Sequence, residues 1–482
     1  MKPLKSALFF SAVLIAMQGI FLLIPREGVA LFSLHLKNPM PAVQIRKWLR
    51  EPAVTVAADT AVVHAVTLPD TSVRDTVAVK KVPRVTGKPE TPLSFADSLK
   101  AVVPRLEMND TARIRLFRIF RILDSLHSRK ENMHILYYGD SQIEGDRITS
   151  VVRDTLQQRF GGGGPGLFLP VMTVPFTTTL RITTTGRWLA VMRKKSGNRM
   201  RFPRGIFGGY SVYDPHGDST GTGHCRVAIQ SFSPATAKHY NQVGVWLYPA
   251  GNKGVVRVDA GGLPAGSDTV DRSRQPICYR YAVGQPRHKL DISFGFSEPV
   301  AVEAILIQDS VGVCVDNIPL RGRLLMSFTG CDRTLLERMF HDLNVRMIIL
   351  QFGLNVAAGE KKDIKYYRKT FRRELRYLRT TFPEVFVVVV GVTDMAGDGK
   401  ETEEKIHMIR DVQRQAALDE GYAFWDAFRA MGGDNAIMRW AAHRPSLARP
   451  DYAHLSYEGA QLLGTLFVRS LMKDYKDYQY GR

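Results

Sequence analysis

The stretch that decides the fold is HILYYGDSQIEGDRITSVV, residues 134–152. It opens with apolar residues, breaks abruptly at Gly139-Asp140-Ser141, and then continues with a pattern typical of a helix. A short apolar run that ends at such a break predicts a buried strand, so Ser141 is expected in the tight turn at its carboxyl end. A serine is a weak nucleophile by itself, so its partners must come from residues far away in sequence.

Four more short apolar runs predict buried strands, and helical patterns lie next to most of them. The predicted strands are 133–138, 311–315, 346–351, 385–391 and 422–425, and the predicted helices are 146–159, 332–341, 361–380, 401–419 and 456–473. A further helix is expected after the capping residues Asn109 and Asp110. Strands that alternate with helices predict an α/β domain, with a five-stranded parallel sheet covered on both faces.

The interval between the first two predicted strands is too long for one crossover connection. Residues 171–304 instead carry stretches of alternating apolar and polar residues, such as CRVAIQSFS at 225–233, separated by turns rich in glycine and proline. This alternation predicts a β-sandwich inserted into the α/β domain. The two parts of the α/β domain are therefore expected at 96–170 and 305–482.

The N-terminus has the pattern of an export segment. Two lysines precede an 18-residue apolar run, residues 7–24, and such a run is just long enough to cross a bilayer. We expect residues 1–27 to stay as an uncleaved anchor in the cytoplasmic membrane, with the rest of the chain in the periplasm. Secretion after signal cleavage is the alternative. Residues 28–95 are expected to be a juxtamembrane region and an extended linker.

The chain is strongly basic, with 66 Lys and Arg against 46 Asp and Glu and a net charge of +20. This charge suits an anionic surface such as phospholipid or a carboxylate-bearing glycan. No basic arm, zinc-finger spacing or aromatic–basic interleaving is found, so no nucleic-acid partner is expected. The cysteines, Cys225, Cys278, Cys314 and Cys331, match no zinc motif. They allow three disulfide connectivities, and the sequence leaves open whether any disulfide forms.

Polar residues follow the predicted strands at their carboxyl ends, the edge at which open parallel sheets bind ligands. The first strand is followed by Ser141, and beyond the others come Gly322, Gly353 and Asn355, Asp394, and finally Asp451 and His454. A serine, a histidine, a carboxylate and several hydrogen-bond donors are thus expected at one edge of the sheet.

These groups can carry out acyl transfer. His454 could take the proton of Ser141, while Asp451 holds the imidazole in the right tautomer. The Ser141 N–H, the Gly322 N–H and the Asn355 amide could stabilise an oxyanion. Each also has an ordinary structural reading, since Ser141 and Asn355 could cap helices and Gly322 could serve a turn. The set requires no metal and no organic cofactor.

The order of these motifs resembles that of the SGNH/GDSL hydrolases. Gly139-Asp140-Ser141, Gly322, Gly353-x-Asn355 and Asp451-x-x-His454 are similar to blocks I, II, III and V, and the resemblance covers about residues 130–160 and 305–473. The first block looks like that of peptidoglycan O-acetylesterases, in which a carbohydrate-binding-like β-sandwich interrupts the hydrolase domain. The resemblance implies a flavodoxin-like three-layer α/β/α SGNH hydrolase with such an insert.

The same resemblance implies a function. The expected activity is that of a serine esterase that removes O-acetyl groups from a cell-envelope glycan, peptidoglycan above all, through an acyl-enzyme on Ser141. An O-acetyltransferase with the same triad and a sugar hydroxyl as acceptor is one alternative, and a non-catalytic glycan-binding protein is another. Asp140, Gln142, Gly353 and Asp394 are candidate substrate contacts. Asp140 is expected to stabilise the turn rather than to belong to the triad, and a turn after a strand explains Asp394 equally well. Relatives often have His or Asn in place of Gln142, which is expected to tune the site geometry.

Overall fold

The structure is a computed structural model, and it describes residues 29–31, 34–36, 94–172, 179–192, 202–216, 221–284, 288–359, 363–397 and 401–481. The chain divides into two compact units, Met1–Lys88 and Pro89–Arg482. In the first unit, the described residues form two antiparallel strands, β1 (Val29–Leu31) and β2 (Leu34–Leu36), which the sequence did not predict. The expected anchor at 1–27 and most of the expected linker lie outside the described residues.

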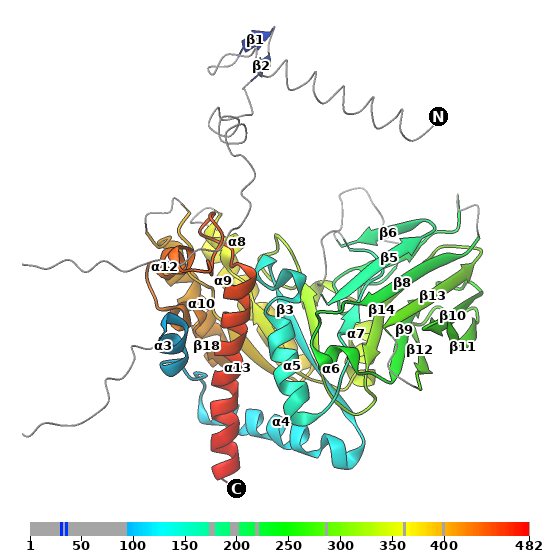
Figure 1. The fold of residues 1–482 in the computed structure, drawn as a ribbon, viewed down its shortest axis with the longest axis horizontal. Helices are drawn as coiled ribbons and strands as arrows, with labels where there is room; N and C mark the ends of the chain where they lie inside the picture. Colours follow the sequence, from blue (N-terminus) through cyan, green and yellow to red (C-terminus); the bar gives the residue numbers. More distant parts are fainter. Residues whose placement is uncertain are drawn as a thin grey trace, which may run out of the picture. The chain divides into compact units, whose positions relative to one another are not determined.

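The second unit is built around a parallel five-stranded sheet, shown in Figure 1. Its strands are β3 (Asn132–Gly139), β15 (Gly312–Pro319), β16 (Val345–Gln351), β17 (Phe386–Val390) and β18 (Ala423–Trp425). All five predicted strands are therefore confirmed, and so is the α/β fold class.

The strand order of this sheet creates a crevice at its carboxyl edge. The order is β15-β3-β16-β17-β18, which is 2-1-3-4-5 when the strands are numbered along the chain, as in flavodoxin-like sheets. Connections leave in opposite directions on the two sides of β3, so the loops after β3 and β16 separate there. Ser141 and Asn355 follow these two strands.

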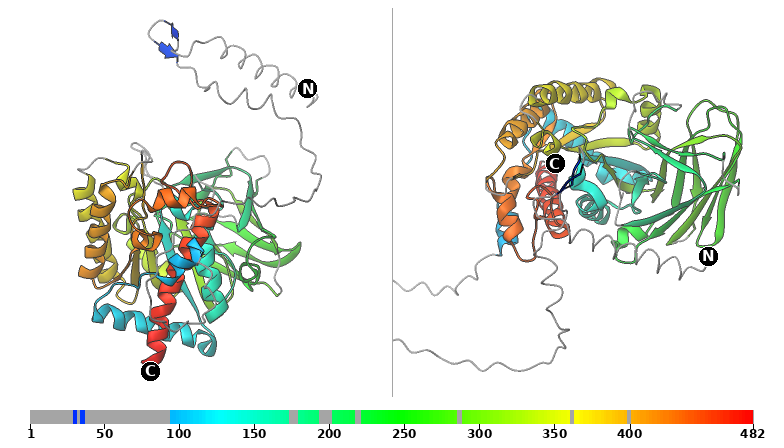
Figure 2. Two further views of the ribbon diagram at one scale, coloured as in Figure 1. Left: turned by 60° about the vertical axis from the view of Figure 1, so that its left-hand side comes forward. Right: turned by 90° about the horizontal axis from the view of Figure 1, so that it is seen from above.

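Helices cover both faces of the parallel sheet (Figures 1 and 2), with α5 and α13 on one face and α9 on the other. The helices are α3 (Phe95–Ala101), α4 (Asp110–Arg129), α5 (Thr149–Phe160), α7 (Arg333–Asp342), α8 (Leu354–Ala357), α9 (Asp363–Thr381), α10 (Lys405–Asp419), α11 (Ala427–Met431), α12 (Ala436–Ala442) and α13 (Tyr457–Tyr480). Asn109 caps α4 as predicted, because its side chain accepts the Ala112 N–H at 2.8 Å. The predicted helices are confirmed, with shifts of a few residues at their ends.

The inserted part is a β-sandwich of two antiparallel sheets, which lie beside the parallel sheet in Figure 1. One sheet has the order β11 (Leu263–Val270), β10 (Gly254–Ala260), β13 (Lys289–Phe296), β8 (Gly223–Ile229), β5 (Leu180–Thr185). The other has the order β12 (Ile277–Ala282), β9 (Gln242–Tyr248), β14 (Val300–Gln308), β7 (Tyr210–Tyr213), β6 (Trp188–Val191), and β4 (Gly166–Phe168) also pairs with β14. A short helix, α6 (Ala235–Lys238), connects β8 to β9.

The sandwich extends beyond the expected limits of 171 and 304. It begins at Gly166, because β4 pairs with β14, and it ends at Gln308, the last residue of β14. Every residue of β14 is buried, whereas β8 and β13 alternate between buried and more exposed residues. A strand that is buried on both faces reads as a continuous apolar run, like a strand of a parallel sheet.

A glycine run joins the two parts of the fold. Gly161 ends α5 with a φ of 75°, a conformation that favours glycine. A Cβ at Gly163 would clash with the His239 carbonyl, and one at Gly164 would clash with the Ile307 carbonyl. Both carbonyls belong to the sandwich or its connections. The segment that joins the α/β domain to the sandwich therefore needs glycine at these positions, where a side chain would clash.

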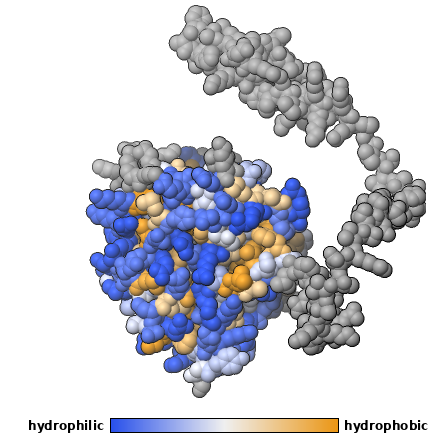
Figure 3. Space-filling view, turned by 90° about the vertical axis from the view of Figure 1, so that its left-hand side faces the viewer, coloured by the Kyte–Doolittle hydropathy of each residue, from blue (hydrophilic) through white to orange (hydrophobic). Residues whose placement is uncertain are grey.

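The described residues also bear on the cysteines and on the surface. All four cysteines lie in the described part of the chain, and each is unpaired. Among the helices of that part, none combines the length and the apolar character needed to cross a bilayer. The face shown in Figure 3 is largely hydrophilic, with apolar residues in small scattered groups. The outer sides of the helices on this face are therefore solvated.

Candidate active site

Ser141 lies in a tight turn at the carboxyl end of the central strand. β3 ends at Gly139, and the short 3₁₀ helix η1 (Ser141–Asp146) follows. The cap of η1 is Asp140, whose side chain accepts the Gln142 N–H at 3.0 Å. Because Asp140 supplies the cap, the Ser141 hydroxyl is available for another partner. We call residues 139–147 the serine turn.

The partner of Ser141 is His454, as the sequence predicted. Nε2 of His454 lies 2.9 Å from Oγ of Ser141. Nδ1 of the same ring lies 2.9 Å from Oδ2 of Asp451. The other carboxylate oxygen of Asp451 accepts the backbone N–H groups of Ala453 at 3.0 Å and His454 at 2.9 Å. We call residues 449–455, which form this turn, the histidine loop.

These contacts set the charge of Asp451. Burial alone would raise the pKa of its carboxyl group, but the hydrogen bonds from the backbone N–H groups and from the ring of His454 outweigh burial and hold the pKa below its usual value. Asp451 is therefore ionised, and a carboxylate next to Nδ1 keeps the ring proton on that nitrogen. Nε2 is then free to accept the proton of Ser141.

Gln142 connects the serine turn to the histidine loop. Its Nε2 donates to the Ala453 carbonyl at 2.9 Å and to Oγ1 of Thr393 at 3.1 Å. Its Oε1 accepts the Leu455 N–H at 3.3 Å. The side chain thus contacts both neighbours of His454 and is itself buried. The expectation that it tunes the geometry fits these contacts, but its candidate role as a substrate contact does not, because its polar atoms are used inside the protein.

Arg147 makes a second connection between the same two segments. Its guanidinium donates to the Leu455 carbonyl at 2.9 Å and to the Ser141 carbonyl at 3.2 Å, and its Nε donates to the Glu144 carbonyl at 2.8 Å. Sequence reasoning missed Arg147, and it also missed Thr393. The available signal for Arg147 was its position within the serine turn, where a buried arginine needs several backbone acceptors.

The expected oxyanion donors come from two loops that contact each other. Nδ2 of Asn355 donates to the Arg323 carbonyl at 3.0 Å, next to Gly322. On the other side of Gly322, Nε of Arg321 lies 2.9 Å from Oε1 of Glu144 in the serine turn. Gly322 is exposed and has a φ of 68°, a conformation that favours glycine. The loop that carries it is therefore held against both Asn355 and the serine turn.

Asp140 and Gly353 are two buried residues of the site. Asp140 is buried, and burial raises the pKa of its carboxyl group from 3.8 to about 6, although the Gln142 N–H and the nearby His454 ring oppose the shift. Gly353 has a φ of 137°, and a Cβ there would lie 2.8 Å from Cβ of Val392. Both residues are buried, which favours a structural role, and their expected role as substrate contacts stays a prediction.

Asp394 is also a structural residue. Its carboxylate accepts the Met395 N–H at 2.9 Å, the Thr402 hydroxyl at 2.9 Å and the Ile437 N–H at 2.8 Å. Burial raises the pKa of this carboxyl group, although these donors oppose the shift. The expectation of a substrate contact is therefore corrected. Its position after β17 was predicted, but the direction of its side chain could not be.

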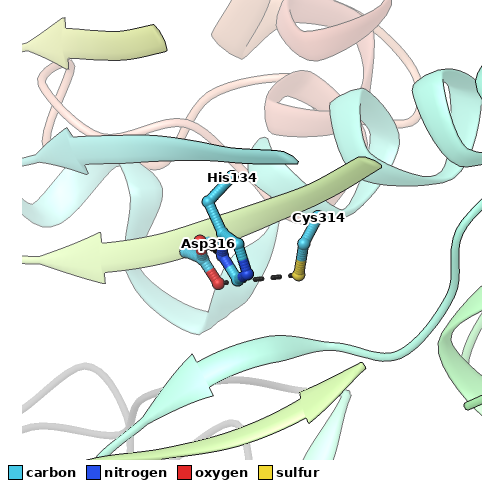
Figure 4. Close-up of side chains that lie close together, drawn as sticks. All are labelled: His134, Cys314 and Asp316. Carbon is cyan, nitrogen blue, oxygen red and sulfur yellow. Dashed lines mark hydrogen bonds and ion pairs between the residues drawn. The ribbon is translucent and has the colours of Figure 1, made fainter. Parts of the chain in front are cut away.

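The only group of three potential metal ligands in the described ranges lies away from the serine turn, near the start of β3 (Figure 4). It consists of His134, Cys314 and Asp316, all buried. Nδ1 of His134 lies 2.7 Å from Oδ2 of Asp316, and its Nε2 lies 2.7 Å from Oε1 of Gln308. The other oxygen of Asp316 accepts the Leu167 N–H at 2.8 Å. Because these ligand atoms already have partners, the cluster fits a structural network between β3, β15 and β14.

Comparisons with known proteins support the fold. No protein-family model and no curated protein sequence matches the chain. A solved structure described as "Peptidoglycan O-acetylesterase in action, 5 min" is 18% identical, with a TM-score of 0.60 over 77% of this chain and 99% of that chain. Its likeness supports the fold described above, an α/β domain interrupted by a β-sandwich.

Two other solved structures match smaller parts of the chain. A family two carbohydrate esterase from Clostridium thermocellum in complex with cellohexaose is 10% identical, with a TM-score of 0.23 over 53% of this chain and 93% of that chain. A putative GDSL-like lipase from Parabacteroides merdae is 16% identical, with a TM-score of 0.25 over 33% of this chain and 73% of that chain. At these TM-scores, the two structures add nothing to the description of the fold.

Proposed function

We propose that the protein is a serine esterase that removes O-acetyl groups from a polysaccharide of the cell envelope, with peptidoglycan as the substrate. The observation that carries the proposal is the continuous hydrogen-bonded chain from Ser141 through His454 to Asp451, with 2.9 Å at both links. A nucleophile, a base and an orienting carboxylate in this order are the recurring arrangement of serine hydrolases.

In the proposed reaction, Oγ of Ser141 attacks the acetyl carbonyl carbon while Nε2 of His454 takes the hydroxyl proton. The tetrahedral intermediate then breaks its bond to the sugar oxygen, which leaves as an alcohol with the proton from His454. Water attacks the resulting acetyl ester of Ser141, again with His454 as the base. Acetate leaves, and the serine hydroxyl is restored.

The negative charge of the intermediate needs donors that are in place before the substrate arrives. We assign this role to the N–H groups of Ser141 and Gly322 and to the side-chain amide of Asn355. One such donor typically contributes about 3–4 kcal/mol to transition-state stabilisation. The Asn355 amide carries two hydrogens, and its bond to the Arg323 carbonyl uses one of them. The second hydrogen is the one we assign to the oxyanion.

The choice of an acetylated glycan as substrate is supported by three features. The structure with the same fold at a TM-score of 0.60 is described as a peptidoglycan O-acetylesterase. The inserted β-sandwich provides an additional surface beside the α/β domain, and the net charge of +20 suits an acidic polymer. The N-terminal pattern of lysines and an apolar run supports a location outside the cytoplasm, in the periplasm, with residues 1–27 as a retained anchor.

The test is acetate release from O-acetylated peptidoglycan by the full chain in detergent and by its Ser141→Ala variant. We expect release by the wild type and at least ~1,000-fold less by Ser141→Ala. Ser128→Ala, which removes an exposed hydroxyl bonded only to its own helix at the Ser125 carbonyl, serves as the matched control and should behave like the wild type.

Equal release by the wild type and Ser141→Ala would contradict the proposal. If neither releases acetate, the same proteins are incubated with deacetylated glycan and a soluble acetyl donor. Transfer that depends on Ser141 would replace the esterase by an O-acetyltransferase with the same triad. No transfer would leave the glycan-binding alternative.

A further inference from the structure

A hollow lies on the outer face of the sandwich sheet that contains β5, β8, β10 and β13. Its volume is about 450 Å³, within the range of roughly 300–1,000 Å³ that small-molecule sites occupy. Its lining includes the cations Arg181, Arg226 and Lys289 together with Thr183, Asp259 and Asp291. Cationic side chains are prominent in this lining, and aromatic side chains are lacking.

The strand register explains the shape of the hollow. Lys289 on β13 pairs with Ala228 on β8, and Ala228 pairs with Arg181 on β5. These three residues form one row on the same face, and neighbouring strands are ~4.8 Å apart. The small side chain of Ala228 therefore forms a floor between two long cationic side chains whose backbones are about 10 Å apart. Gly261 continues this row on the other side of Lys289, where its N–H donates to the Lys289 carbonyl at 2.8 Å.

The lining of the hollow has a net positive charge, because the cations Arg181, Arg226 and Lys289 outnumber the carboxylates of Asp259 and Asp291. In the part of the chain that the structure describes, Arg181 and Lys289 form no ion pair and no side-chain hydrogen bond. Asp291 is already engaged, because it accepts from Nε of Arg226 at 2.7 Å and lies 2.9 Å from Nδ1 of His224. Two exposed cations thus face an open space across a floor without charge.

We propose that this hollow binds a carboxylate-bearing sugar unit of the polysaccharide, with the carboxylate between Arg181 and Lys289. Arginine and lysine bind carboxylates through charge-assisted hydrogen bonds. Asp259 and Thr183 at the edges of the hollow can accept or share hydrogen bonds from sugar hydroxyls. The two aspartates also select against a phosphate dianion, and the lack of aromatic residues in the lining removes the usual stacking platform for a neutral sugar.

The hollow lies at the end of the sandwich that contacts the serine turn. Oγ1 of Thr179 donates to Oδ2 of Asp146 in η1 at 2.9 Å. Arg181 follows two residues later, about 7 Å along the strand. A polymer bound at Arg181 is therefore held near the domain that carries Ser141. The identity of the polymer rests on the proposed function, whereas binding of the carboxylate does not.

The test measures binding to the full chain that carries Ser141→Ala, which prevents turnover, by titration calorimetry. The probes are tetragalacturonate, its fully methyl-esterified and hence neutral form, and soluble peptidoglycan fragments, and inorganic phosphate is titrated separately as an anion that is not a sugar. We expect at least one anionic probe to bind, and the neutral ester to bind at least 10-fold more weakly than tetragalacturonate. Adding Arg181→Gln and Lys289→Gln together should weaken binding at least 10-fold. Arg257→Gln is the matched control, because Arg257 is exposed on the same sheet face but outside the hollow, and it should change binding less than 2-fold.

Three results would overturn the inference: no binding of any anionic probe, equal weakening by Arg257→Gln, or tighter binding of inorganic phosphate than of tetragalacturonate at the same site. Hydrolysis of a small acetate ester, measured in parallel with Ser141 intact, separates this inference from the proposed function. The double variant should retain the wild-type rate, which also shows that it is folded. If binding follows the expected pattern but no ester is cleaved, only the proposed function fails. If the ester is cleaved but nothing binds, only this inference fails.

Discussion

The carboxyl edge of the parallel sheet and the outer face of the sandwich differ in whether their polar side chains have partners inside the protein. At the sheet edge, the side chains of Ser141, His454 and Gln142 all have partners inside the protein. On the sandwich face, Arg181 and Lys289 are exposed on either side of Ala228. Catalysis needs groups that are oriented before the substrate arrives, whereas a binding surface can keep its charges in water until a ligand replaces the water.

The two regions also differ in what fixes their geometry. Ser141 and His454 are 313 residues apart, and the tertiary contacts of Gln142 and Arg147 help to hold their segments together. The cationic row of the sandwich depends on strand register alone. Substitutions at the sheet edge should therefore change geometry, pH dependence and rate, whereas substitutions on the sandwich face should change binding only.

Apart from substitutions in the triad, the largest loss of activity is expected for Asn355→Ala. Asn355→Ala removes an oxyanion donor and the bond to the Arg323 carbonyl, so kcat/KM for a small acetate ester should fall by about 100- to 1,000-fold. Asn252→Ala is the matched control, because Nδ2 of Asn252 makes the same kind of bond to the Pro299 carbonyl in the sandwich, at 2.9 Å. A loss at Asn355 no larger than that at Asn252 would show that the amide serves structure alone.

Asp140 offers a test that is based on pH. Burial raises the pKa of Asp140 from 3.8 to about 6, so between these values the folded protein holds a proton that the unfolded chain has lost. Stability therefore falls as the pH rises through this range. Relative to Asp140→Asn, the wild type should lose about 2–2.5 kcal/mol of unfolding free energy between pH 4 and pH 7, because the shift is worth ~1.4 kcal/mol per pKa unit and a small part of it is already lost at pH 4.

Urea unfolding of both proteins at several pH values measures this difference directly. A difference in unfolding free energy that stays constant from pH 4 to pH 7 would mean that Asp140 titrates at the same pH in the folded and unfolded chains. Asp140 would then not be buried in the serine turn as the structure places it.

A smaller effect is expected at Gln142, which acts by positioning the histidine loop. Gln142→Met keeps the side-chain volume but removes the bonds to Ala453, Leu455 and Thr393. Slight displacement of His454 should lower kcat by about 10- to 100-fold, with KM changed less than ~2-fold because the substrate is not contacted. Gln158→Met, an exposed glutamine on α5, should leave both constants unchanged. A rise in KM with unchanged kcat would return Gln142 to the role of a substrate contact.

The parallel sheet and its edge could be predicted because each strand is a short apolar run with polar residues beyond its carboxyl end. Val387–Val390 followed by Asp394 and Ile348–Leu350 followed by Asn355 show this pattern clearly. The limits of the sandwich were harder to predict for two reasons. β14 is buried on both faces and so lacks alternation, and β4 has only three residues within a glycine-rich segment.

For the site, sequence position predicted which residues approach the sheet edge but not where their side chains point. Ser141 lies in a tight turn, and Asp451 and His454 form an i, i+3 pair, so position predicted both segments at the sheet edge, where the fold brings them together. Asp394 has the same strand-end position as Asn355, yet it turns inward toward the Ile437 N–H. The contacts of Gln142 with Thr393, Ala453 and Leu455 depend on the packing of loops that are distant in sequence, and no local sequence pattern predicts that packing.

The most direct test of the central claim is detection of the acyl-enzyme. The full chain is mixed with an activated acetate ester, quenched in acid within milliseconds, digested and examined by mass spectrometry. We expect one added acetyl group on the peptide that contains Ser141. Turnover of the ester without acetylation of Ser141 under any of these conditions, or acetylation at another residue, would contradict it.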